Sequence, residues 1–328
     1  MMIDYSATAL LIAAFLDYLI ADPSNIPHPV QVMGSIISFT SKTVTDFTKN
    51  STPRRLAGIV FGMGLIIGSG VFGWVVIYFS KQLSLLLSFS VEVILLASCF
   101  AGRSLRNAAV AVLTPLNNNE IGNARTQLSY YVGRDTEDLS TSEMLRAVLE
   151  TIAENTTDGV TAPLFYAIIG LLIPGLGSVP LVLAYKAAST LDSMVGYQRE
   201  PFTDFGWFSA KFEDALTWLP CRLTVLSIGL IARKPLRVWQ ICQRDAAKDP
   251  SPNAGWSECA YAVVLGVQLG GKNTYQGIIK EKPLLGNPDQ PIAEETIEQA
   301  LNLTRICFLS WLALGVALSW RGYGAILQ

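Results

Sequence analysis

Apolar residues in this chain gather in long runs that polar segments separate. The clearest run, 56–79, contains no charged residue and is long enough to cross about 30 Å of hydrocarbon. A second run, 83–101, holds Glu92 near its middle, where an ionisable group should face protein or water rather than lipid. Shorter runs at 7–21 and 306–320 are further candidate spans. The pattern predicts an all-α, polytopic helical membrane protein.

Two further apolar runs contain helix-breaking residues. Three prolines interrupt 160–186, so we expect a hairpin of two short helices broken at 174–175. The run 215–231 contains Pro220 and Arg222, which makes it a doubtful span. Irregular backbone is tolerated at membrane depth where protein or a cavity covers it. We therefore expect a single integral membrane domain over the whole chain, with broken or re-entrant helices.

Composition supports a membrane protein and excludes several other classes. Hydrophobic residues make up 51% of the chain, charged residues 15%, and the mean hydropathy is +0.38. A net charge of -2 gives no nucleic-acid surface, so we expect no nucleic-acid partner. One histidine and five cysteines without a CxxC pair argue against a zinc site or a disulfide framework.

The distribution of basic residues predicts a topology. They cluster at 42–55, 103–146 and 233–248, and the positive-inside rule places all three clusters in the cytoplasm. A single crossing at 160–186 would put polar groups meant for one substrate on opposite sides of the bilayer. A re-entrant hairpin there keeps them together, and we favour it. The polar helices and loops are thus expected to face the cytoplasm.

The most informative polar stretch is 150–159, which follows a helix that begins near the capping-box-like 140–143. At helical spacing Glu150, Glu154 and Asp158 lie on one face. Like charges so close together favour a bound cation, a metal-bound phosphate or an amine. A solvated helix end is the alternative interpretation of the same spacing.

Other polar tracts add candidate residues. The tracts 191–197 and 205–214 are typical of a lined binding site rather than of a lipid-facing surface. The proline-rich loop 22–30 can hold Asp22 and His28 in place, although a structural hydrogen bond by the histidine is an equal alternative. Within 269–277, a Gly-Gly-Lys-Asn turn at 270–273 can offer backbone N–H groups and an ammonium to a phosphate. It lacks the Walker A pattern, however, and an ordinary turn is its favoured interpretation.

Taken together, these tracts resemble the adenosylcobinamide-phosphate synthases of cobalamin biosynthesis, a family of multi-pass membrane proteins. The most specific motifs are Glu154-Asn155-Thr156-Thr157-Asp158-Gly159 and Leu191-Asp192-Ser193-Met194-Val195-Gly196-Tyr197. The others, in order, are 16–17 with 22–23, 27–30, 162–165, 205–207, 251–255 and 269–271. One departure is Asp249, where members often carry a histidine or another basic residue, which weakens any phosphate role for this position.

The resemblance implies an amide-forming enzyme. It would join the ring D propionate of adenosylcobyric acid to the amine of (R)-1-amino-2-propanol O-phosphate, or of ethanolamine phosphate, with ATP and Mg²⁺ as cofactors. A free carboxylate is a poor electrophile, so the reaction would pass through an acyl phosphate. The resemblance also implies a location in the cell inner membrane, in contact with the lipid bilayer, with the active site facing the cytoplasm.

Residue roles follow from the same resemblance. The expected catalytic residues are Glu154, Asn155, Asp158 and Asp192, and the expected Mg²⁺ ligands are Glu154, Asp158 and Asp192. The expected substrate-binding residues are Asp22, His28, Arg134, Ser193, Tyr197, Trp207, Lys211, Asn253 and Lys272. Among these, Arg134, Lys211 and Lys272 are expected anion partners, and Tyr197 and Trp207 would pack on the corrin.

Two other functions remain compatible with the sequence. Broken apolar segments, an intramembrane Glu92 and gathered carboxylates would also suit an ion-coupled transporter. The long polar segments and the lack of an internal repeat argue against a compact permease. The third candidate is a non-catalytic scaffold that contacts other enzymes of the corrin pathway.

Overall fold

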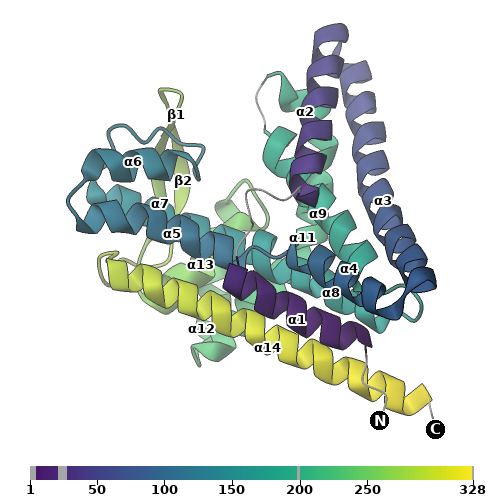
Figure 1. Cartoon of the computed structure of the whole chain (residues 1–328). Coiled ribbons are helices and arrows are strands. Elements are labelled where there is room, and N and C mark those ends of the chain that lie inside the picture. Colours follow the sequence, from purple (N-terminus) through teal and green to yellow (C-terminus); the bar gives the residue numbers. More distant parts are fainter. Residues whose placement is uncertain (1–4, 21–27, 198–199, 327–328) are drawn as a thin grey trace. The chain divides into compact units, whose positions relative to one another are not determined.

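The structure, a computed structural model, describes residues 5–20, 28–197 and 200–326 and is dominated by helices (Figure 1). The predicted all-α class is confirmed. Among the described residues, the sheet is a single two-stranded hairpin. Four helical segments there are long and apolar enough to cross a membrane: Ser51–Leu83, Leu85–Asn117, Trp207–Ile231 and Glu294–Trp320. The chain is therefore a polytopic helical membrane protein.

Two compact units make up the chain. The first comprises residues 1–101, 162–216 and 310–328, and the second comprises 102–161 and 217–309. The helices of the first unit are α1 (Tyr5–Ile20), α2 (Pro29–Phe47), α3 (Ser51–Leu83), α4 (Leu85–Ala97), α8 (Ala162–Leu172), α9 (Ser178–Val195) and α10 (Phe202–Phe205). Residues of α11 (Trp207–Ile231) and α14 (Glu294–Ile326) belong to both units.

The second unit contains the remaining elements. These are α5 (Gly102–Asn117), α6 (Ile121–Ser129), α7 (Thr141–Asn155), the π-helical turn η1 (Thr156–Thr161), α12 (Pro235–Asp245), the 3₁₀ turn η2 (Ala246–Lys248), α13 (Ala254–Leu265), β1 (Leu269–Tyr275) and β2 (Ile278–Leu285).

In the first unit, small residues let helices approach closely. Gly58 and Gly62 of α3 are buried, and a Cβ at Gly58 would collide with the carbonyl of Phe205. Gly64, by contrast, has open space around it.

The apolar run 160–186 divides into α8 and α9. Gly175 in the connection has a φ of +80°, a left-handed conformation that glycine adopts readily.

The run 215–231 lies within the continuous helix α11, which includes Pro220. The Thr224 hydroxyl donates a hydrogen bond to the Pro220 carbonyl.

Glu92 on α4 is only 4% exposed. It therefore faces protein, as expected of an ionisable group at that depth.

The hairpin of the second unit corrects one expectation. The Gly-Gly-Lys-Asn stretch 270–273 is expected to be a turn, but it lies within β1, which pairs with the antiparallel β2. The chain turns instead at Gln276 and Gly277, whose φ angles are 52° and 76°. Positive φ is strained for most residues but accessible to glycine, and paired positive φ angles match the twist of a tight hairpin.

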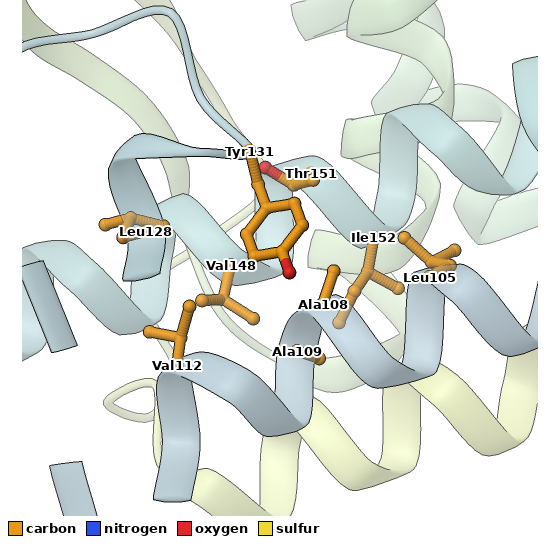
Figure 2. A pocket seen from close by; sticks show the side chains of 9 residues that line it. All are labelled: Leu105, Ala108, Ala109, Val112, Leu128, Tyr131, Val148, Thr151 and Ile152. Carbon is orange, nitrogen blue, oxygen red and sulfur yellow. The ribbon is translucent and has the colours of Figure 1, made fainter. Parts of the chain in front are cut away.

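Helices α5, α6 and α7 enclose a narrow apolar crevice (Figure 2). Figure 2 shows the Tyr131 ring among small and branched side chains that include Ala108 of α5 and Val148 of α7. The volume is about 10 Å³, close to the minimum that one water needs. This crevice is a packing feature of the helices and is too small for a substrate.

Candidate functional site

Helix α7 carries two of the carboxylates in the second unit, Glu150 and Glu154. It begins at Ser140, whose side chain accepts from the Glu143 amide while the Glu143 carboxylate accepts from the Ser140 amide. The predicted capping box is confirmed, and its hydrogen bonds lower the pKa of Glu143. Glu150 and Glu154 follow one helical turn apart, so the local sequence fixes their common face.

A wider π-helical turn, Thr156–Thr161, follows α7 directly. Thr156 Oγ1 lies 2.9 Å from the Tyr261 hydroxyl and 2.8 Å from Thr304 Oγ1, and all three side chains are buried. Thr157 Oγ1 lies 2.9 Å from Ser257 Oγ. These buried hydroxyls fix the π turn against α13 and α14. Single π turns inside helices are frequent at functional sites, and this one carries Asp158.

Glu150 is a buried anchor rather than an open ligand. Its side chain is 3% exposed, forms an ion pair with Arg134, and lies 3.3 Å from Arg146 Nη1. Its Oε1 also accepts from the Gly270 amide at 3.0 Å. Arg146 further donates to the carbonyls of Gly270 and Lys272. The glutamate and its two arginines therefore fasten β1 to α7, and one predicted anion partner, Arg134, is engaged in this anchor.

A second buried carboxylate lies on α13. Glu258 is fully buried, and Lys282 Nζ of β2 donates to its Oε1 at 3.0 Å. Its other oxygen, Oε2, is buried and has no hydrogen-bond partner within the described residues. Unpaired buried carboxylate oxygens are rare because their desolvation is costly, so this atom marks a place for a ligand or a proton.

Four carboxylates, including that of Glu258, raise the pKa of Lys282. Desolvation would lower the pKa of Lys282, but Glu258, Glu154, Glu150 and Asp249 raise it above its ordinary value. We call Lys282 and these four carboxylates the Lys282 cluster. Desolvation raises the pKa of Glu258 to about 8; Lys282 opposes this rise, while Glu150 and Glu154 add to it.

Glu154 is the accessible carboxylate of the Lys282 cluster. Its side chain is exposed to water, and within the described ranges it makes no hydrogen bond or ion pair. Protein nevertheless surrounds it closely, so desolvation raises its pKa, as do Asp249 and Glu150. Lys282 and Arg134 act in the opposite direction. An accessible carboxylate without a partner is available to a cation carried by a substrate.

The loop before α13 places Asp249 and Asn253. Asp249 Oδ1 accepts from the Ser251 amide at 2.9 Å, and its Oδ2 is buried without a hydrogen-bond partner among the described residues. Gly255 permits this approach, since a Cβ there would lie 2.6 Å from the Asp249 Cβ. Asn253 Oδ1 accepts from Arg222 Nη1 at 2.7 Å, so the predicted binding residue Asn253 has a structural partner.

The other predicted residues of the second unit are more exposed. Asn155 donates its amide back to the Thr151 carbonyl at 2.9 Å, and Asp158 is partly buried in the π turn. Lys272 on β1 is exposed. The lysine that reaches the carboxylates is thus Lys282 on the partner strand.

The remaining predicted residues lie in the first unit. Ser193 donates to the Thr190 carbonyl, and the carboxylate of Asp192 lies so close to Gly196 that a Cβ would not fit. Tyr197 and Lys211 are exposed. The Arg55 guanidinium lies over the Trp207 ring, 3.6 Å from its centroid. His28 is the N-cap residue of α2. Asp22 lies outside the described residues.

The predicted site residues are divided between the two units. Glu154, Asn155, Asp158, Arg134, Asn253 and Lys272 share the second unit, while Asp192 belongs to the first. Within residues 5–20, 28–197 and 200–326, no three or more His, Cys, Asp or Glu side chains are grouped to hold a metal. Sequence reasoning missed Glu258 and Lys282, although a lone carboxylate in the apolar stretch 254–265 was a usable signal.

Comparison with known proteins gives a consistent result. A family profile described as CobD/Cbib protein matches residues 10–304. The cobalamin biosynthesis protein CobD of Synechocystis is 51% identical over 93% of this chain and 89% of its own length. CobD of Halalkalibacterium halodurans is 40% identical over 95% of this chain and 97% of its own length. CbiB of Salmonella typhimurium is 38% identical over 94% of this chain and 96% of its own length. No solved structure matches the chain.

Proposed function

This chain belongs to the CobD/CbiB family of adenosylcobinamide-phosphate synthases, and from that premise we propose that it forms an amide bond in cobalamin biosynthesis. The acid is the ring D propionate of adenosylcobyric acid, and the amine is (R)-1-amino-2-propanol O-phosphate or ethanolamine phosphate. The reaction uses ATP and gives adenosylcobinamide phosphate, which makes the protein a carbon–nitrogen ligase. The family matches support the cobalamin role, and the Lys282 cluster supports the chemistry.

The observation that carries the proposal is the Glu258 carboxylate with its unpaired Oε2, close to the accessible Glu154. Amide formation from an ammonium and a carboxylate needs an activated acyl group and an acceptor for the amine's protons. ATP supplies the activation by transferring its γ-phosphoryl group to the propionate oxygen. The Lys282 cluster combines an accessible carboxylate with a buried one, and these are two of the group types that the reaction needs.

Magnesium ions enter the proposal as companions of ATP. Mg²⁺ in phosphoryl-transfer sites is held by one or two protein carboxylates together with phosphate oxygens and waters, so a closed protein cage is not required. The accessible Glu154, together with Asp158 in the following turn, fits that donor set. The metal would neutralise phosphate charge there. The role of Asp192 as a Mg²⁺ ligand stays a prediction.

We further propose that the protein lies in the cell inner membrane with its site in the cytoplasm. The basic segments 42–55, 103–146 and 233–248 support this orientation through the positive-inside rule. Two of them belong to the second unit, which carries the Lys282 cluster. ATP is a cytoplasmic substrate, so this orientation gives the proposed site access to it.

A single-turnover experiment tests the proposal. The purified protein in detergent is incubated with adenosylcobyric acid, aminopropanol phosphate and Mg-ATP, and the corrin is followed by mass spectrometry. We expect a product with the mass of the amide, formed only with ATP and accompanied by ADP. The control replaces ATP with a non-hydrolysable analogue. Absence of product with either amine, even with native lipid present, would contradict the proposal and favour a scaffold or a transporter.

A further inference from the structure

With all four carboxylates ionised, the Lys282 cluster would hold more negative charge than its cations balance. The two arginines of the anchor, Arg134 and Arg146, pair with Glu150. Glu154, Glu258 and Asp249 are then left with Lys282. Both Glu258 and Asp249 also keep a buried oxygen without a hydrogen-bond partner in the described part of the chain. The site is therefore short of positive charge and of donors.

A compact donor cation would supply both. No three His, Cys, Asp or Glu side chains of the described residues are grouped to hold a metal ion, so a ligand that hydrogen-bonds to one oxygen fits better than a closed metal cage. A primary ammonium carries one positive charge and three N–H donors. It would satisfy Glu258 Oε2 while Lys282 Nζ continues to occupy Oε1.

We propose that Glu258 is the catalytic residue that binds the ammonium group of the amine substrate through Oε2 and accepts its proton, with Lys282 as the positioning residue. This inference rests on the proposed ligase function and goes beyond it by assigning a base. Lys282 reaches Glu258 from β2, and the Glu150 anchor fastens the other strand of the hairpin to α7. The hairpin thereby holds the carboxylate in one orientation.

The proposed step balances in protons and bonds. One ammonium proton moves to Glu258 Oε2, and the freed nitrogen lone pair attacks the acyl phosphate carbon. The new C–N bond forms, and the C–O bond to phosphate breaks with its electron pair leaving on phosphate. A second proton leaves the nitrogen with the departing phosphate, so that one N–H remains in the amide.

The electrostatic setting suits a proton acceptor. The charged groups that act on Glu258 are Lys282 from β2 and Glu150 and Glu154 from α7, and together with burial they place its pKa at about 8. A base is most effective when its pKa lies near the working pH and it is not much weaker than the group it deprotonates. An arriving ammonium adds positive charge and favours the ionised form of Glu258.

Hydroxylamine provides the decisive test because it is already a neutral nucleophile at pH 7. Wild-type protein with adenosylcobyric acid and Mg-ATP should form the hydroxamate with hydroxylamine and the amide with aminopropanol phosphate. In E258Q, amide formation should fall by roughly 10²-fold or more, the scale of losing a general base. Hydroxamate formation should stay within about threefold, since a neutral nucleophile does not need the base. The matched control is E281Q, an exposed glutamate beside Lys282 on β2.

Each result has a separate meaning. If E258Q forms the amide at the wild-type rate, or loses hydroxamate and amide equally, the assignment of Glu258 as base is overturned. If the wild type forms neither product, the ligase proposal itself fails, which is a different outcome.

A second variant tests the inference even if E258Q does not fold. Lys282 lowers the pKa of Glu258, so K282Q should move the pH of half-maximal amide formation upward. Hydroxamate formation by K282Q should keep the wild-type pH profile, and K282R should restore the profile of amide formation. An unchanged amide profile in K282Q would overturn the assignment.

Discussion

Lys282 Nζ donates to Glu258 Oε1 across 3.0 Å, joining β2 of the hairpin to the fully buried carboxylate of α13. The lysine side chain is 28% exposed while the glutamate is 0% exposed, so the pair spans the boundary between solvent and core. A buried carboxylate that keeps one unpaired oxygen is costly to stability. Its place among the four carboxylates that act on Lys282 is the strongest sign of function in the second unit.

The Lys282 and Glu258 pair should make stability depend on pH. The pKa of Glu258 rises from 4.5 to about 8 on folding, so the folded state keeps a proton that the unfolded state releases between those values. Stability from this group is therefore fully present below about pH 4 and declines as the pH rises to about 8. Above that, the ionised carboxylate depends on Lys282 for its charge partner.

We expect K282M to lose more stability at pH 9 than at pH 6. At pH 9 the variant leaves a buried carboxylate unpaired, which costs about 3–5 kcal/mol, whereas at pH 6 Glu258 holds a proton. Unfolding in detergent at both pH values measures the difference. K280M, which replaces an exposed lysine of the same strand, is the control. An equal loss at both pH values would show that Glu258 ionisation does not depend on Lys282.

Removing the Glu150 carboxylate should release the hairpin. Glu150 pairs with Arg134 and Arg146 and accepts from the Gly270 amide, so E150A leaves two partly buried guanidinium groups without their carboxylate. We expect a loss of about 3–5 kcal/mol and faster amide exchange across β1. Hydrogen exchange followed by mass spectrometry measures this. E137Q, at an exposed glutamate, is the control, and unchanged β1 exchange in E150A would refute the anchoring role.

Local sequence signals predicted the elements that local interactions determine. The capping box at Ser140 and Glu143 fixed the start of α7, and helical spacing then placed Glu150 and Glu154 on one face. The long apolar runs predicted membrane-spanning helices for the same reason, since a helix satisfies its own backbone in lipid. The fold class and the acidic helix face were thus readable without tertiary information.

The rest of the site depends on contacts between residues distant in sequence. Glu258 lies on a helix that reads as apolar core, and only its contact with Lys282, in a separate strand, shows that it is part of a charged site. The two glycines expected to form a turn, Gly270 and Gly271, occupy β1 at φ +83° and +85°, a conformation that spacing rules do not distinguish from a turn. Local sequence patterns do not show which residues distant in the chain come into contact.

Close packing along α3 yields a matched pair of variants in the first unit. A Cβ at Gly58 would collide with the Phe205 carbonyl, while Gly64 has open space around it. We expect G58A to lose about 1–3 kcal/mol by overpacking, and G64A to be neutral or slightly stabilising because alanine favours helix. Thermal unfolding in one detergent compares them. Similar midpoints for both would show that Gly58 does not set the approach of α10 to α3.

Glu154 and Glu258 should be separable by their response to magnesium. E154A should lower turnover by roughly 10²-fold or more, because it removes an accessible carboxylate proposed to hold the Mg²⁺ that neutralises phosphate charge. Membrane insertion should stay intact. The milder E154Q should raise the Mg²⁺ concentration needed for half-maximal rate, whereas E258Q should leave that concentration unchanged. D192A should lower turnover to the same extent, as expected of a Mg²⁺ ligand. E298Q, at an exposed glutamate of α14, is the control, and wild-type rates in E154A or D192A would remove that residue from the site.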